Sequence, residues 1–110
     1  MNPGDPASVE LSSETLRRLE TLFSSETQDV AALLLREECG NNLPLLRDAD
    51  GNAVERIRIA ALKVSGGDLA KLEQAVDLAK TDWRDLLVAA GFEHDVQAHL
   101  KWLPQSPQPG

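Results

Sequence analysis

The sequence predicts an all-α protein, a compact single-domain bundle of about five to six short helices. Among its 110 residues, 18 Leu and 13 Ala outnumber 7 Val and 2 Ile. Leu and Ala lose little side-chain freedom in a helix, whereas β-branched residues favour strands. The apolar residues also recur at intervals of three and four, which places them on one face of a helix. A chain of this length can form one hydrophobic core without a metal or a disulfide.

The composition divides the chain into one domain and two tails. Residues 1–10 contain Pro3, Gly4 and Pro6, and residues 104–110 contain three further Pro. Neither segment has enough apolar residues to join a core, so both are expected to be flexible tails. The helical domain is expected to comprise residues 11–103.

A repeated pattern marks the first two helix starts. An apolar residue, two Ser, a Glu and a Thr occur at residues 11–15 and again at 23–27. Ser supplies an oxygen for the helix N-cap, and Glu suits the positive end of the helix dipole. The pattern predicts helices over about 13–23 and 25–39, the second ended by Gly40 and Asn41 before Pro44. The residues expected to face the core are Leu16, Leu19, Leu22, Phe23, Val30, Leu33, Leu34 and Leu35.

The middle of the chain predicts a third helix over about 53–65. Asn52 and Glu55 have the spacing of a capping box, with Asn52 in the cap position. Gly66 is expected to end this helix. The residues expected to face the core are Val54, Ile57, Ala61 and Val64.

Three further helices are expected between residues 68 and 103. Asp68 caps one that reaches about residue 80, and Thr81 or Asp82 opens the next. Because no Gly or Pro separates the two, they could also merge. Gly91 followed by Phe92 predicts a Schellman end in which Phe92 packs on Leu87. The last helix covers about 94–103. The residues expected to face the core are Leu69, Leu72, Val76, Ala79, Trp83, Leu86, Leu87, Ala90, Val96, Leu100 and Leu103.

Charge and cysteine content restrict the function and the compartment. The net charge of −7 disfavours binding to nucleic acid through phosphates and binding to an anionic membrane. The chain shows no membrane-spanning apolar run, and its N-terminus lacks the basic and apolar regions of a signal peptide. The single Cys39 cannot form an internal disulfide. We therefore expect a cytoplasmic protein without a membrane association.

Few residues carry a recognisable chemistry. Residues 48–52 match the first three ligand positions of an EF-hand calcium loop, but Ala53 and Ile59 occupy the positions that need Gly and Glu. His94 and His99 are about 140° apart on a helix, so they cannot share a metal from one face. Cys39 has no adjacent His or other activating cation. We therefore expect neither an enzyme nor a bound metal or cofactor.

The two Trp are the best candidates for a contact surface, because Trp is enriched at binding hot spots. The expected function is binding of another protein, as an adaptor, inhibitor or regulator, through Trp83, Arg84, Lys101 and Trp102. The acidic balance would steer a basic partner, and copies of the chain itself are also candidates.

Two alternatives remain open. One is a nucleic-acid regulator that uses the basic residues Arg47, Arg56, Arg58 and Lys63 in and before the third helix. The other is an enzyme subunit or small-ligand binder with a pocket between helices. The segments 82–92 and 101–104 resemble stretches of small bacterial proteins, and this resemblance implies no activity.

Overall fold

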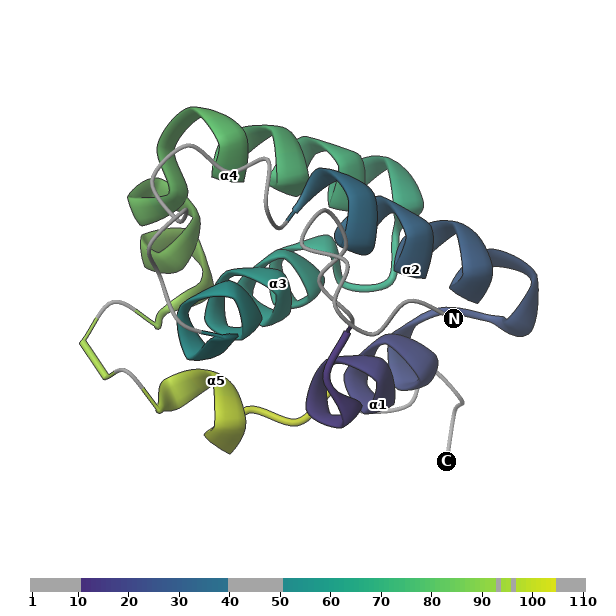
Figure 1. Cartoon of the computed structure of the whole chain (residues 1–110), viewed down its shortest axis with the longest axis horizontal. Helices are drawn as coiled ribbons and strands as arrows, with labels where there is room; N and C mark the ends of the chain where they lie inside the picture. The colour runs from purple at the N-terminus through teal and green to yellow at the C-terminus, as the bar shows by residue number, and fades with distance from the viewer. Residues whose placement is uncertain (1–10, 40–50, 93, 96, 105–110) are drawn as a thin grey trace.

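Helix α3 (Gly51–Ser65) occupies the centre of the computed structural model, which describes residues 11–39, 51–92, 94–95 and 97–104. In Figure 1, α4 (Leu69–Ala90) and α2 (Ser25–Glu38) lie on one side of α3, while α1 (Ser13–Leu22) and α5 (Ala98–Lys101) lie on the other. Helix α3 packs most extensively on α4 and also contacts α1 and α5, whereas α2 packs on α1 and α4. The described residues form these five helices and no strand, which confirms the all-α prediction.

The Cα radius of gyration is 13.1 Å, the value of about 13 Å expected for a compact domain of 100 residues. The predicted compact bundle is therefore confirmed. None of the helices in the described part of the chain has the length and apolar character needed to cross a membrane. Apart from Pro104, the predicted tails lie outside the described residues.

The burial of α3 is broader than the predicted stripe. Every residue from 57 to 62 is buried, including Arg58. Neighbouring helices cover α3 on several sides, so nearly its whole circumference faces protein, as expected for a central helix. The prediction that Val64 faces the core is wrong, since this side chain is 36% exposed.

The predicted N-caps differ in their outcome. Ser12 caps α1, and its Oγ accepts a hydrogen bond from the N–H of Thr15 at 3.1 Å. Ser24 occupies the N-cap position of α2, but its hydroxyl accepts no backbone N–H. The capping box on Asn52 is wrong, because α3 begins at Gly51 and already contains Asn52. The carboxylate of Glu55 accepts a hydrogen bond from the Ser12 hydroxyl instead.

The sequence leaves open whether one helix or two cover residues 68–90. In the structure, α4 consists of two helical segments joined by a kink at Asp82, where the backbone is non-helical with φ −156° and ψ 90°. The Oδ1 of Asp82 accepts hydrogen bonds from the N–H of Arg84 and Asp85 at 3.1 and 3.4 Å. Asp82 therefore caps a second helical segment after a kink, as its side chain predicts.

The end of α4 confirms the Schellman prediction. Gly91 has φ +80°, and its N–H donates to the carbonyl of Val88 at 3.0 Å. The N–H of Phe92 donates to the carbonyl of Leu87 at 2.9 Å, and both side chains are buried.

Several residues predicted to face the core are exposed. The last helix is much shorter than predicted, because only residues 98–101 are helical, and Val96 lies outside the described residues. On α2, burial is confined to the side that faces α1 and α4, where Ala31 and Leu35 lie. The wrongly placed residues, besides Val64, are Leu16, Val30, Leu33, Leu100 and Leu103.

Candidate functional site

A buried polar cluster joins α1, α3 and α5. Its centre is Arg18, whose side chain is 1% exposed. The guanidinium donates to the carbonyls of Trp102 and Leu100 at 3.0 and 3.2 Å and to Glu14 Oε1 at 2.7 Å. The hydrogen bond from Arg18 lowers the pKa of the Glu14 carboxyl. Arg18 thereby ties the C-terminal segment to α1.

The second part of the cluster contains Ser12, Glu55 and His99. The hydroxyl of Ser12 donates to Oε2 of Glu55, and His99 Nε2 lies 3.4 Å from the other oxygen of this carboxylate. His99 is fully buried, and neither ring nitrogen has a hydrogen-bond partner. Burial lowers the pKa of His99, and Arg56 and Arg18 act in the same direction, while Glu55 opposes the shift.

This order of residues differs from that of a catalytic triad. In a triad the His lies between the nucleophile and the acid, so that it can accept the proton of the nucleophile. Here Glu55 lies between Ser12 and His99. The Ser12 hydroxyl also caps α1. The geometry supports a role in holding three helices together.

The buried His99 predicts a loss of stability at mildly acidic pH. The unfolded chain binds a proton at His99 near pH 6.5, while the folded protein requires a lower pH. Below pH 6.5 the unfolded state therefore binds more protons than the folded state, so the free energy of unfolding decreases as the pH is lowered. Urea unfolding of the wild type and His99→Gln between pH 7 and 5 should show a shallower pH dependence in the variant. Parallel curves would contradict the prediction.

Cys39 is the C-cap residue of α2 and is buried. Burial raises the pKa of its thiol to about 12, against the smaller opposing effects of Arg58 and Lys80. The thiol is therefore neutral near pH 7, and a neutral thiol is a poor nucleophile. The Nε of Arg58 donates to the Cys39 carbonyl at 2.8 Å, so this buried guanidinium serves the end of α2.

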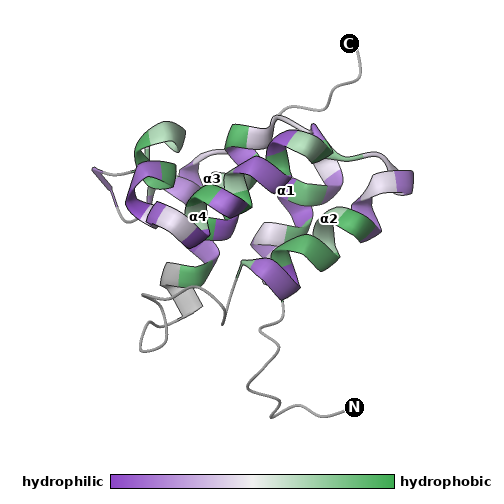
Figure 2. Ribbon diagram, turned by 90° about the horizontal axis from the view of Figure 1, so that it is seen from above, coloured by the Kyte–Doolittle hydropathy of each residue, from purple (hydrophilic) through white to green (hydrophobic). Residues whose placement is uncertain are grey.

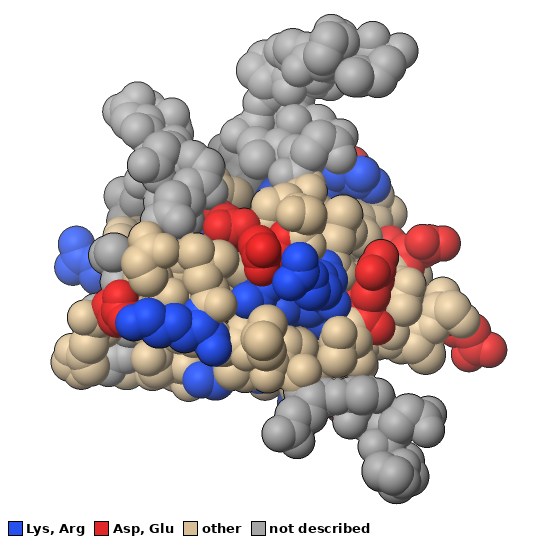
Figure 3. All heavy atoms as spheres, turned by 90° about the horizontal axis from the view of Figure 1, so that it is seen from below, with Lys and Arg blue, Asp and Glu red and all other residues tan. Residues whose placement is uncertain are grey.

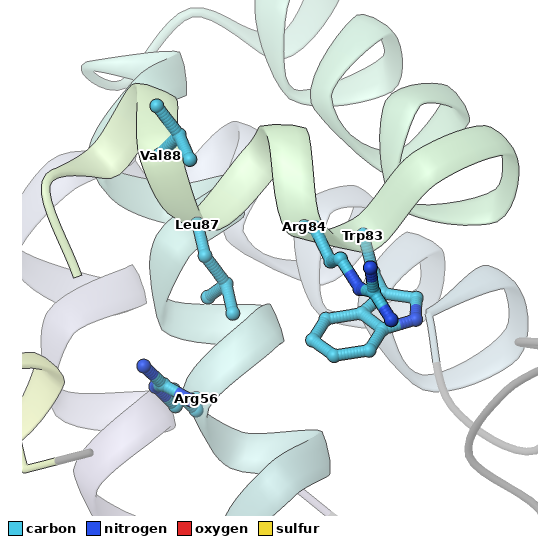
Figure 4. A pocket seen from close by; sticks show the side chains of 5 residues that line it. All are labelled: Arg56, Trp83, Arg84, Leu87 and Val88. Atoms are coloured by element: carbon cyan, nitrogen blue, oxygen red, sulfur yellow. The ribbon is translucent and has the colours of Figure 1, made fainter. Parts of the chain in front are cut away.

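A surface depression of about 340 Å³ brings two of the predicted contact residues together. We call it the Trp83 pocket, and its lining residues are Arg56, Trp83, Arg84, Leu87 and Val88. Leu87 points from α4 toward Arg56 on α3, with Trp83 and Arg84 beside it (Figure 4). The kink at Asp82 begins the segment that carries four of the five residues.

The Trp83 pocket combines positive charge with apolar walls. The Arg84 guanidinium lies 5.7 Å from the centre of the Trp83 ring, within the range of a cation–π contact. Nη2 of Arg56 donates to the carbonyl of Phe92 at 2.6 Å. Arg56 Nε and Trp83 Nε1 are buried without a hydrogen-bond partner. Both N–H groups are shielded from solvent, so the exposed guanidinium of Arg84 is the group that suits a ligand with oxygen acceptors.

The other two predicted contact residues lie outside this pocket. Trp102 is half-buried against the core, and Lys63 Nζ lies 6.0 Å from the centre of its ring. Lys101 pairs with Asp95 at 2.7 Å, and this hydrogen bond lowers the pKa of the Asp95 carboxyl. The structure therefore does not place the two predicted Trp contacts in one pocket.

The basic residues of the nucleic-acid alternative are also separated. Arg58 is 2% exposed, Arg56 lines the Trp83 pocket, Lys63 is exposed, and Arg47 lies outside the described residues. On the face shown in Figure 3, patches of Lys and Arg alternate with Asp and Glu. On this face, the described residues form no continuous basic stripe of the kind that follows a phosphate backbone.

The described part of the chain contains no group of three His, Cys, Asp or Glu side chains placed to hold a metal ion. His94 is exposed, whereas His99 is buried in the polar cluster. Most of the calcium-loop match at 48–52 lies outside the described residues.

Sequence reasoning selected Trp83 and Arg84 but missed the residues that complete their pocket. Leu87 is buried in the core, as predicted, and it also lines the pocket, while the sequence places Arg56 only among the basic residues of the third helix. The available signal is the spacing of Trp83 and Leu87 and of Arg84 and Val88, since residues four apart are neighbours on a helix.

No protein-family model matches the sequence, and comparisons with curated proteins and with solved structures also give no match. A functional assignment therefore rests on the residues and geometry of the site.

Proposed function

We propose that this protein functions by binding another protein, with the Trp83 pocket as the contact site. The observation that most directly supports this proposal is that an indole, two guanidinium groups and two aliphatic side chains surround one open depression. Trp and Arg are the residues most enriched at binding hot spots. Val88 is 56% exposed, so an apolar group of a partner would remove it from water.

The chemistry of the pocket favours a partner segment that carries a carboxylate next to an apolar side chain. An Arg binds a carboxylate by two parallel hydrogen bonds, and the exposed guanidinium of Arg84 can donate both. Leu87 and Val88 supply the apolar wall. A volume of about 340 Å³ accommodates a short segment of the partner. Outside the pocket, the net charge of −7 favours a basic partner surface.

A charge reversal at Arg84 tests this proposal. The tagged protein is used for affinity capture from a lysate of its own host, with low-salt and high-salt washes. We expect the wild type to retain a partner protein in stoichiometric amount at high salt. The amount of this partner retained by Arg84→Glu should be lower by about tenfold or more. The matched control is Arg17→Glu, which makes the same change at an exposed Arg of α1 outside the pocket. This control should retain the partner as well as the wild type does.

Three outcomes would contradict the proposal. Equal loss of the partner in Arg84→Glu and Arg17→Glu would assign the effect to net charge. Nucleic acid that is captured at low salt and lost at high salt would favour the nucleic-acid alternative. A small anionic molecule that raises the melting temperature of the wild type but not of Arg84→Glu would make the pocket a small-ligand site.

A further inference from the structure

The outer face of α2 exposes apolar side chains that the rest of the described chain does not cover. Val30 and Leu33 are each 50% exposed, and Leu34 is half-buried beside them. These three residues, which we call the α2 stripe, line a surface depression of about 230 Å³ together with Glu37 and Glu38. In both Figure 1 and Figure 2, α2 lies at one side of the molecule.

Acidic residues stand at both ends of the α2 stripe. Glu26 precedes Val30 by four residues, and Glu37 follows Leu33 by four, a spacing that makes each pair neighbours on a helix surface. Both Glu are exposed. Arg36 lies about 120° around the helix from Val30, so it is not part of this face. In Figure 2 the hydrophobic residues occupy the middle of α2, with hydrophilic residues toward its ends.

We propose that the α2 stripe is a second docking surface, whose partner is a basic amphipathic helix. The apolar residues at positions i, i+3 and i+4 form the row that packs against a facing helix. The two flanking Glu require Lys or Arg near both ends of the partner's apolar face. The Trp83 pocket carries the opposite charge, so the two surfaces select partners of different chemistry.

A second copy of the chain fits this surface poorly. In an antiparallel pair of α2 helices about a two-fold axis, Glu26 of each copy would face Glu37 of the other. In a parallel pair, each Glu would face its own counterpart. The tails at 1–10 and 105–110 contain neither Lys nor Arg, so they lack the charge that the surface requires. A basic helix from another protein satisfies both the apolar row and the acidic ends.

Two designed peptides of equal length and identical apolar face provide the test. One has only Leu and Lys, the other only Leu and Glu, and both are labelled for fluorescence anisotropy. The wild type should bind the Leu/Lys peptide at least about tenfold more tightly than the Leu/Glu peptide. Leu33→Ser should weaken binding of the Leu/Lys peptide about tenfold, because it removes half-exposed apolar surface from the contact.

A matched pair of double variants separates a local contact from long-range attraction. Glu26→Lys/Glu37→Lys should weaken binding of the Leu/Lys peptide about tenfold or more. Glu20→Lys/Glu73→Lys changes the net charge equally at exposed acids on α1 and α4 and should weaken it about twofold or less. Arg84→Glu should leave this affinity unchanged, so that failure of the α2 stripe is distinguishable from failure of the Trp83 pocket.

Several results would overturn the inference. Equal weakening by both double variants would show that net charge alone attracts the peptide. A melting temperature of Leu33→Ser lowered far more than the lower helix propensity of Ser accounts for would show that the protein's own chain packs on the stripe. A wild-type dimer that becomes monomeric in Leu33→Ser would make the occupant a second copy.

Discussion

Gly67→Ala should lower the free energy of unfolding by about 3 kcal/mol, whereas Gly66→Ala should lower it by about 1 kcal/mol. Both glycines lie in the turn between α3 and α4 with positive φ, +91° and +60°. A Cβ on Gly67 would lie 2.6 Å from the carbonyl oxygen of Leu22, the last residue of α1. Because that oxygen belongs to the backbone, α1 would have to shift to relieve the contact.

Gly66 is the matched control, since a Cβ at this position meets nothing within 4 Å. Gly66→Ala therefore carries only the cost of a left-handed conformation for a residue with a side chain. Urea unfolding followed by circular dichroism measures both variants. Equal losses would show that the contact with Leu22 does not constrain the turn.

Arg18→Ala should lower the free energy of unfolding by about 3 kcal/mol, because it removes the donor at the centre of the buried polar cluster. The variant leaves Glu14 and the carbonyls of Leu100 and Trp102 without their guanidinium partner. The loss should appear first in the C-terminal segment, since Arg18 is its hydrogen-bonded anchor on α1. Hydrogen exchange at residues 98–102 should therefore rise more than exchange within α3.

The neighbouring Arg17 supplies the control for this variant. Its side chain is 65% exposed, and it lies 3.8 Å from Glu14. A surface pair of this kind contributes little, so Arg17→Ala should change the free energy of unfolding by about 0.5 kcal/mol or less. Arg18→Met keeps much of the side-chain volume, and it should still be clearly less stable than the wild type. Wild-type stability in Arg18→Met would contradict a role for the hydrogen bonds.

If both proposals hold, the protein is a small adaptor with two contact surfaces. The Trp83 pocket is proposed to bind a segment with a carboxylate, and the α2 stripe, with Glu26 and Glu37, is proposed to bind a basic helix. They lie on different helices, since α3 and α4 line the pocket and α2 carries the stripe. Arg84→Glu and Leu33→Ser should therefore each remove one partner while the other is retained.

Local signals in the sequence predicted the class of fold and several helix ends. Asp82 and Gly91 act through hydrogen bonds to residues at most four positions away along the chain, apart from the Phe92–Leu87 bond that completes the Schellman motif. Such interactions depend on short stretches of sequence, so their residue types reveal them. The same holds for the balance of Leu and Ala over Val and Ile, which favours helix wherever it occurs.

The choice between buried and exposed was decided by the tertiary structure. Arg17 and Arg18 are adjacent and identical, yet only Arg18 meets the C-terminal carbonyls. Leu33 and Leu35 belong to one helix, but α1 and α4 cover only the side that carries Leu35.

The sequence by itself determined an acidic, all-α chain and several helix ends, and it offered four candidate contact residues, Trp83, Arg84, Lys101 and Trp102. The tertiary structure decided that Arg56 joins the first two of these in a pocket, that Glu55 meets both Ser12 and His99, and that one face of α2 stays uncovered. The physical reason is distance along the chain. A cap or a helical periodicity involves residues within a few positions, whereas these contacts join residues from 27 to 44 positions apart, and their formation depends on how whole helices pack.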